Sequence, residues 1–76
     1  MNKNRRNELT AVLAKIEEIR NELESIMNDE EEYRDNMPEN LQGSERFEQS
    51  DNACSEMQIA LDGLDEVFLN IESAQE

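Results

Sequence analysis

Five carboxylates near the middle of the sequence are the residues whose types and spacing could do chemistry. Glu31, Glu32 and Asp35 form one group, and Glu48 and Asp51 form a second group after twelve intervening residues. Within each group the spacing matches one turn of helix, and two antiparallel helices joined by a short turn would bring the groups together. Carboxylate oxygens bind hard cations such as Mg²⁺, which can activate a water molecule. The pattern could therefore place several carboxylates around one hard cation.

This arrangement resembles the EExxE…ExxD carboxylate pattern of the all-α nucleotide pyrophosphohydrolases. The resemblance implies Mg²⁺ ions held between two helices and a nucleoside triphosphate such as dUTP as substrate. Two departures count against it: Asp35 stands where the family has a third Glu, and the chain is too short for the helices of a family subunit. A solvated acidic helix face explains the same residues. Pyrophosphohydrolase activity is therefore kept as a distant alternative.

The composition excludes several other functions. The chain has no His and a single Cys, which removes Ser-His, Cys-His and His-metal chemistry. Its net charge of −13 excludes a generic DNA or RNA binder and disfavours anionic lipid. We expect no enzymatic activity, no cofactor, no metal, and no direct contact with nucleic acid or membrane. No secretory signal or long apolar run is found, and with the lone Cys54 this predicts a cytoplasmic protein.

The apolar residues define two long amphipathic helices. In the first half they recur in alternating steps of three and four, with Glu30 filling the one missing place. This is a heptad pattern with a at positions 9, 16, 23, 30 and 37 and d at positions 12, 19, 26 and 33. The second half repeats the alternation at Phe47, Ser50, Cys54, Met57, Leu61, Leu64, Phe68 and Ile71. Small residues at the adjoining g positions would let another helix approach closely: Ala53, Ala60, Val67 and Ala74.

A short turn separates the two helices. Pro38 cannot continue a helix interior, Gly43 tolerates a positive φ, and Ser44 is a good N-cap. Leu41 is expected to tuck under Phe47. The sequence thus predicts an all-α fold: an antiparallel two-helix coiled-coil hairpin with helices at about 6–36 and 44–74 and a turn at 37–43.

Folding the chain near residue 41 makes opposed residue numbers add up to about 81. The two polar exceptions in the apolar pattern, Glu30 and Ser50, then lie opposite each other. They form either a polar notch that fixes the register or a frayed, wet end, and we favour the second because the turn is close. Cys54 falls opposite Ile26, where it is a packed, structural thiol rather than a nucleophile.

Charge is distributed unevenly along the hairpin. Residues 1–20 carry a net charge of +2 and the remainder carries −15, with no Lys or Arg after Arg46. The antiparallel arrangement returns the basic N-terminus to a position beside Glu72 and Glu76. Such exposed pairs contribute only about 0–1 kcal/mol each, so they favour the hairpin without deciding it.

Two function hypotheses follow from the surface. Ile59 and Leu69 lie off the shared contact line, at f and b, and short chains commonly need a partner. We therefore expect a homodimeric four-helix bundle that acts as a protein–protein interaction module. The alternative is that Asp62, Asp65 and Glu66 belong to an acidic rod that imitates DNA and inhibits a nucleic-acid-binding enzyme. High net charge also serves solubility alone.

The turn segment carries one further resemblance. Residues 33–46, with the run NMPENLQ followed by SER, resemble a group of small acidic helical proteins from phages, prophages and mobile elements of Gram-positive bacteria. The similarity spans roughly residues 30–75. It implies a hairpin and a small accessory or regulatory protein that binds a host or phage protein, without implying an activity.

Overall fold

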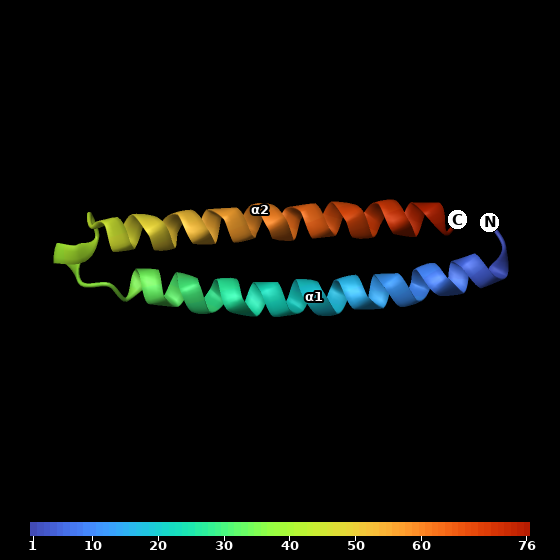
Figure 1. Ribbon diagram of the computed structural model, residues 1–76, viewed down its shortest axis with the longest axis horizontal. Coiled ribbons are helices and arrows are strands. Elements are labelled where there is room, and N and C mark those ends of the chain that lie inside the picture. Colours follow the sequence, from blue (N-terminus) through green and yellow to red (C-terminus); the bar gives the residue numbers. More distant parts are fainter.

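The computed structural model describes all residues, 1–76, and contains two long helices and no strand. Helix α1 spans Lys3–Asp35, a single 3-10 turn η1 spans Glu39–Leu41, and α2 spans Glu45–Ala74. The two helices lie side by side and antiparallel, with both chain ends at the same end of the rod (Figure 1). The Cα atoms extend over 59 × 15 × 12 Å. The chain is therefore an all-α helical hairpin, as the sequence predicted.

Helix α1 begins earlier than the expected residue 6. The side chain of Asn2 accepts a hydrogen bond of 2.8 Å from the backbone N–H of Arg5. This N-cap satisfies a backbone donor that the first turn would otherwise leave free, so the helix extends to Lys3. At the other end α1 stops at Asp35, ahead of Pro38, because the proline disfavours helical geometry for the residue before it.

The turn is closed by hydrogen bonds rather than by glycine geometry. The Ser44 hydroxyl accepts from the N–H of Phe47 (3.3 Å) and donates to the carbonyl of Leu41 (2.5 Å), which confirms Ser44 as the N-cap of α2. The turn does not use the tolerance of Gly43 for a positive φ, because no residue of the chain has one. Leu41 does not tuck under Phe47 either: it stays 39% exposed, and Met37 is buried at this end instead.

The predicted contact line of α2 is correct. All eight of its residues are buried or half-buried: Phe47, Ser50, Cys54, Met57, Leu61, Leu64, Phe68 and Ile71. Leu61 is the most deeply buried side chain of the chain, at 1% exposed. It lies at the middle of α2, so the best-packed layer of the hairpin is central rather than at the turn.

Helix α1 turns a different line of residues toward α2 from the one expected. Its a positions are buried or half-buried, but the second set of contacts comes from e, with Leu13 and Met27 buried. The other two e residues, Arg20 and Arg34, form ion pairs with α2. The d residues expected in the core are instead exposed: Val12 39%, Ile19 53%, Ile26 59% and Tyr33 43%. The rotation of α1 from d to e leaves four large apolar residues at the surface and brings in two, Leu13 and Met27, together with the two arginines that form ion pairs with α2.

Hydrogen bonds between the helices fix the register and confirm the predicted one. Ser50 bonds to Glu30 near the turn, and at the open end the amide of Gln75 donates to the carbonyl of Arg6 (3.0 Å). These pairs sit at opposite ends of the rod and both follow the expected sum of about 81. The register therefore holds over the full length of the hairpin.

Two expectations about the ends of the hairpin are wrong. Ser50 is only 5% exposed and holds Glu30, so this layer is a buried polar notch and not a frayed, wet end. At the open end, none of the four ion pairs involves a residue of the basic N-terminus. The side chain of Gln75 joins the helices there instead, donating to Arg6 and to the hydroxyl of Thr10.

Neither helix combines the length and apolar character that crossing a bilayer requires.

Candidate functional site

The residues predicted to bind a partner lie on the outer side of α2. Ile59, Asp62, Glu66 and Leu69 follow one another in steps of three, four and three, so they share one side of the helix. All four are exposed, with Ile59 at 63% and Leu69 at 62%. We call this set the outer face of α2. It combines two isolated apolar side chains with two carboxylates.

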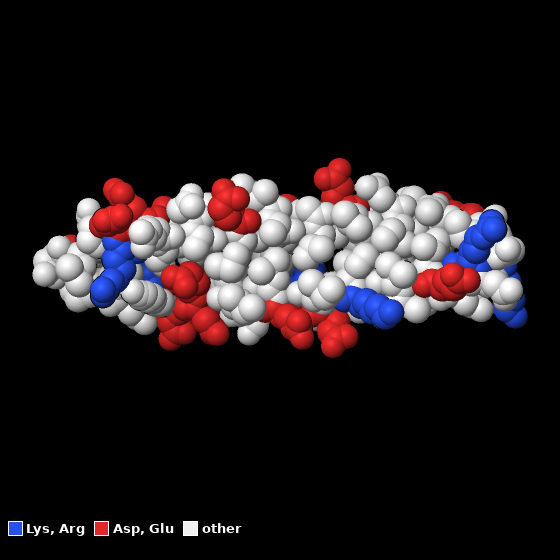
Figure 2. Space-filling view, viewed as in Figure 1, with Lys and Arg blue, Asp and Glu red and all other residues white.

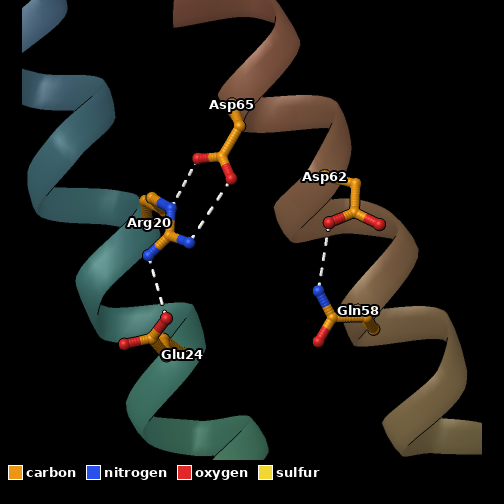
Figure 3. Close-up of polar contacts among 5 residues, drawn as sticks. All are labelled: Arg20, Glu24, Gln58, Asp62 and Asp65. Carbon is orange, nitrogen blue, oxygen red and sulfur yellow. Dashed lines mark hydrogen bonds and ion pairs between the residues drawn. The ribbon is translucent and has the colours of Figure 1, made fainter.

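Asp65, the fifth predicted residue, has a different role. Nε of Arg20 on α1 donates to Oδ1 of Asp65 at 2.5 Å, and Nη2 of Arg20 lies 3.4 Å from Oδ2 (Figure 3). Nη1 of Arg20 also donates to Glu24 at 2.9 Å. These bonds, first to Asp65 and then to Glu24, raise the pKa of the Arg20 guanidinium. Asp65 therefore joins the two helices, whereas Asp62 accepts from Gln58 one turn away on the same helix (3.1 Å).

A second ion pair across the helices explains why the turn-end carboxylates form no metal site. Arg34 donates to Asp35 through Nε and to Asp51 through Nη1, both at 3.0 Å. The bond to Asp35 is the main cause of the raised pKa of Arg34. No group of three His, Cys, Asp or Glu residues in the hairpin is arranged to hold a metal ion. Arg34 thus holds two of the five carboxylates, Asp35 and Asp51, and the five do not converge within one hairpin.

Cys54 is packed into the contact between the helices, as the sequence indicated, but its expected partner Ile26 is 59% exposed and the buried Met27 takes that place. It is 5% exposed, and burial raises the pKa of its thiol. A raised pKa reduces the thiolate fraction, and the thiolate is the nucleophilic form. The structure therefore gives Cys54 a packing role.

The surface hollows are open grooves along the hairpin. One of about 330 Å³ is lined by Ile16, Leu64 and Phe68, with the Arg20–Asp65 pair at its rim. Another of about 190 Å³ lies over Cys54 beside Arg34. Both follow the side of the rod that carries the two ion pairs. A third hollow, of about 480 Å³, lies at the C-terminal end of α2 and is lined mainly by polar residues: Leu69, Glu72, Ser73, Gln75 and Glu76.

An unexpected surface is the line of d residues on α1 that the rotation of the helix leaves uncovered. Val12, Ile19, Ile26 and Tyr33 repeat every seven residues, so they lie in one row along the helix, and we call this row the apolar stripe. Each is at least 39% exposed. Four large apolar side chains recur in one row, each about 10 Å from the next, whereas single exposed apolar residues scattered over a surface are normal.

The small g residues of α2 lie on the same side of the hairpin as the apolar stripe. The Arg20–Asp65 and Arg34–Asp51 pairs mark one side of the contact between the helices. On α1 each stripe residue directly precedes an e residue, and on α2 each g residue directly precedes an a residue of the contact line. Both sets therefore lie on the side of the helix contact away from the ion pairs. The g residues of α2 are Ala53, Ala60, Val67 and Ala74. Figure 2 shows a long face of the rod whose middle is largely free of charge, with acidic side chains mostly along its two edges.

The width of the apolar pattern on α1 indicates from the sequence that part of it stays uncovered. Apolar residues on α1 occupy a, d and part of e, with Leu13 following Val12 and Met27 following Ile26. One partner helix covers two adjacent lines of a helix, not three. The three-line width predicts that one line stays uncovered, although it does not say which.

The fold and these surfaces define an acidic helical hairpin with one uncovered apolar face. No protein-family model matches the chain, and neither curated proteins nor solved structures show significant similarity to it.

Proposed function

We propose that this hairpin is a non-enzymatic protein–protein interaction module whose binding surface is the apolar stripe of α1. One observation carries the proposal: four large apolar side chains, 39–59% exposed, stand in a single row on a helix that already has a partner on its other side. A row with heptad spacing suits a partner helix, which can fill the spaces between successive side chains. Burial of this row supplies the free energy of association.

The remaining chemistry of the chain supports a binding role. Cys54 is buried, and two of the five turn-end carboxylates, Asp35 and Asp51, form ion pairs with Arg34. Together with the resemblance of the turn segment to small phage and mobile-element proteins, this favours an accessory or regulatory protein that acts by holding a host or phage protein.

A matched pair of double variants tests which surface binds. Ile19→Lys with Ile26→Lys places two charges in the apolar stripe, and Ile59→Lys with Leu69→Lys places the same charges on the outer face of α2. All four parent side chains are 53–63% exposed, so both variants should keep the helical circular dichroism of the parent chain.

Self-association is measured by sedimentation, and partner binding by affinity capture from a bacterial lysate with mass spectrometry. We expect the stripe variant to lose association and the outer-face variant to retain it. The reverse result would move the binding surface to Ile59 and Leu69. If both variants associate like the parent, the proposed function is wrong.

A second candidate, a DNA mimic, has its own supporting observation. Asp62 and Glu66 are exposed on α2, a helix with no cation after Arg46, whereas Asp65 is paired with Arg20. If this acidic row binds the basic groove in which an enzyme holds nucleic acid, its affinity for the enzyme should fall steeply as the salt concentration rises. The test is displacement of DNA from nucleic-acid-binding enzymes at several salt concentrations. Asp62→Lys with Glu66→Lys should abolish it, and displacement that is insensitive to salt would exclude mimicry.

A further inference from the structure

We propose that the occupant of the apolar stripe is a second copy of this chain, bound with α1 antiparallel to α1 to form a four-helix bundle. This inference rests on the proposed function, because it names the partner for the same surface. Three properties of the hairpin carry it: the symmetry of the stripe, the charges beside it, and the size of the face.

The stripe is complementary to itself. Its members are evenly spaced by seven residues, so a two-fold axis between Ile19 and Ile26 maps the row onto its own reverse. Val12 then lies opposite Tyr33 of the second copy, and Ile19 lies opposite Ile26 of the second copy. The smallest side chain of the row thus meets the largest, which keeps the distance between the two helices even along the contact. The small g residues of α2 flank this row and leave room for the second hairpin.

The same two-fold axis pairs opposite charges at the edge of the stripe. Lys15 and Asp29 each lie three residues after a stripe residue, so they border it on one side. Both are exposed, and neither takes part in the ion pairs of the hairpin. The axis places Lys15 beside Asp29 of the second copy, and this pair occurs twice. It also sets residues 1–20, with a net charge of +2, against the acidic second half of α1.

One contact in this arrangement is unfavourable and gives it a specific signature. Glu22 lies closest to the axis on the same border and meets Glu22 of the second copy. Like charges that face each other across two helices weaken their association. Removal of this charge should therefore strengthen the dimer by more than removal of a carboxylate far from the axis, which relieves only the general repulsion between two chains of net charge −13.

The area of the face is sufficient. The Cα extents of 59 Å by 15 Å give each hairpin a long face on the order of 900 Å², and a standard interface buries about 800 Å² per partner. The single chain also has little interior of its own, since only 6 of its 76 residues are buried. A second copy would cover the exposed apolar side chains and give the bundle a larger buried core.

The test is analytical ultracentrifugation of the full chain with a charge swap. We expect a dimer at micromolar concentrations. Lys15→Glu and Asp29→Lys should each weaken it roughly tenfold, because each creates two repulsive pairs, and the double variant should restore the parent affinity. Glu22→Gln should tighten the dimer several-fold. Lys3→Glu, which changes the charge equally but lies far from the stripe, is the matched control and should have a smaller effect than Lys15→Glu.

The outcomes separate this inference from the proposed function. A chain that stays monomeric overturns the inference, while the proposed function still stands if the stripe variant loses a captured protein that the outer-face variant retains. A dimer that survives Ile19→Lys with Ile26→Lys also overturns the inference. If the charge swap fails to restore affinity, the antiparallel pairing of the two copies is wrong.

Discussion

The hydroxyl of Ser50 donates a hydrogen bond of 2.5 Å to Oε2 of Glu30 across the two helices, in a layer where Ser50 is 5% exposed. These are the two residues that interrupt the apolar pattern, one on each helix. A buried polar pair of this kind is satisfied only when the two helices are in one register, because a shift by a turn leaves both groups facing apolar neighbours.

The first prediction concerns this pair. Ser50→Ala removes the donor to a half-buried carboxylate and should lower the free energy of unfolding by about 1–2 kcal/mol, because an unsatisfied polar group is costly. Replacing both partners, Ser50→Ala with Glu30→Leu, should recover most of this loss. The measurement is urea denaturation followed by circular dichroism. Ser55→Ala, at an exposed position of the same helix, is the control. A double variant less stable than Ser50→Ala would contradict the role of the notch.

The second prediction separates two neighbouring aspartates. Asp65→Asn breaks the ion pair with Arg20 and should lower the midpoint of thermal unfolding, most clearly at low salt. Asp62→Asn removes the same charge, but this carboxylate has no cation beside it, so the variant relieves repulsion in a chain of net charge −13 and should be as stable as the parent or more so. Equal effects of the two substitutions, at low and high salt alike, would rule out a structural role for the Arg20 pair.

The third prediction compares two leucines of α2. Leu61→Ala empties the most buried position of the chain and should cost about 2–4 kcal/mol of unfolding free energy, enough to unfold much of so small a protein. Leu69→Ala truncates a side chain that is 62% exposed and should change stability by less than about 0.5 kcal/mol. Thermal unfolding at one fixed protein concentration gives both values. If the ranking is reversed, the contact line assigned to α2 is incorrect.

The fourth prediction concerns the thiol of Cys54. Its pKa is higher in the folded chain than in the unfolded chain because burial disfavours the thiolate. The unfolded state therefore loses the proton first, and this contribution to stability, complete below about pH 9, falls as the pH rises through the raised pKa. Cys54→Ala lacks the contribution, so its stability should depend less on pH in this window. Equal pH profiles would contradict a buried neutral thiol.

The reactivity of the same thiol offers a second measurement. A disulfide reagent such as Ellman's reagent should react slowly with Cys54 at pH 8. A cysteine moved one residue along the helix, Cys54→Ser with Ser55→Cys, occupies an exposed position and should react much faster.

The hairpin, its register and the contact line of α2 could be predicted from the sequence, because only a and d of α2 carry large apolar residues in successive heptads, whereas Ile59, Val67 and Leu69 each stand alone on their lines. The contact line of α1 could not. Val12 and Leu13, like Ile26 and Met27, are adjacent apolar residues, and periodicity alone does not decide which of each pair is buried. In the arrangement observed, Arg20 and Arg34 at e form ion pairs with α2.

The sequence likewise predicted one of the candidate surfaces and not the other. The outer face of α2 was identified because Ile59 and Leu69 do not fit the heptad pattern. The apolar stripe was missed because its residues fit the pattern well and were assigned to the core. Asp65 was grouped with its exposed neighbours because the sequence does not indicate that Arg20 reaches it across the hairpin. At the turn, Gly43 could adopt a positive φ, but the Ser44 cap and η1 close the turn without one.

The location of both chain ends at one end of the rod has a mechanical consequence (Figure 1). A pull that separates the N- and C-termini loads the layers between the helices one at a time, starting at Gln75 and ending at the turn, so the hairpin unzips at low force. A pull along the rod axis, with both chain ends held at one end of the rod and the turn at the other, stretches both helices together. It does not open the contacts between the helices one after another. The molecule therefore resists tension along its length far better than separation of its ends.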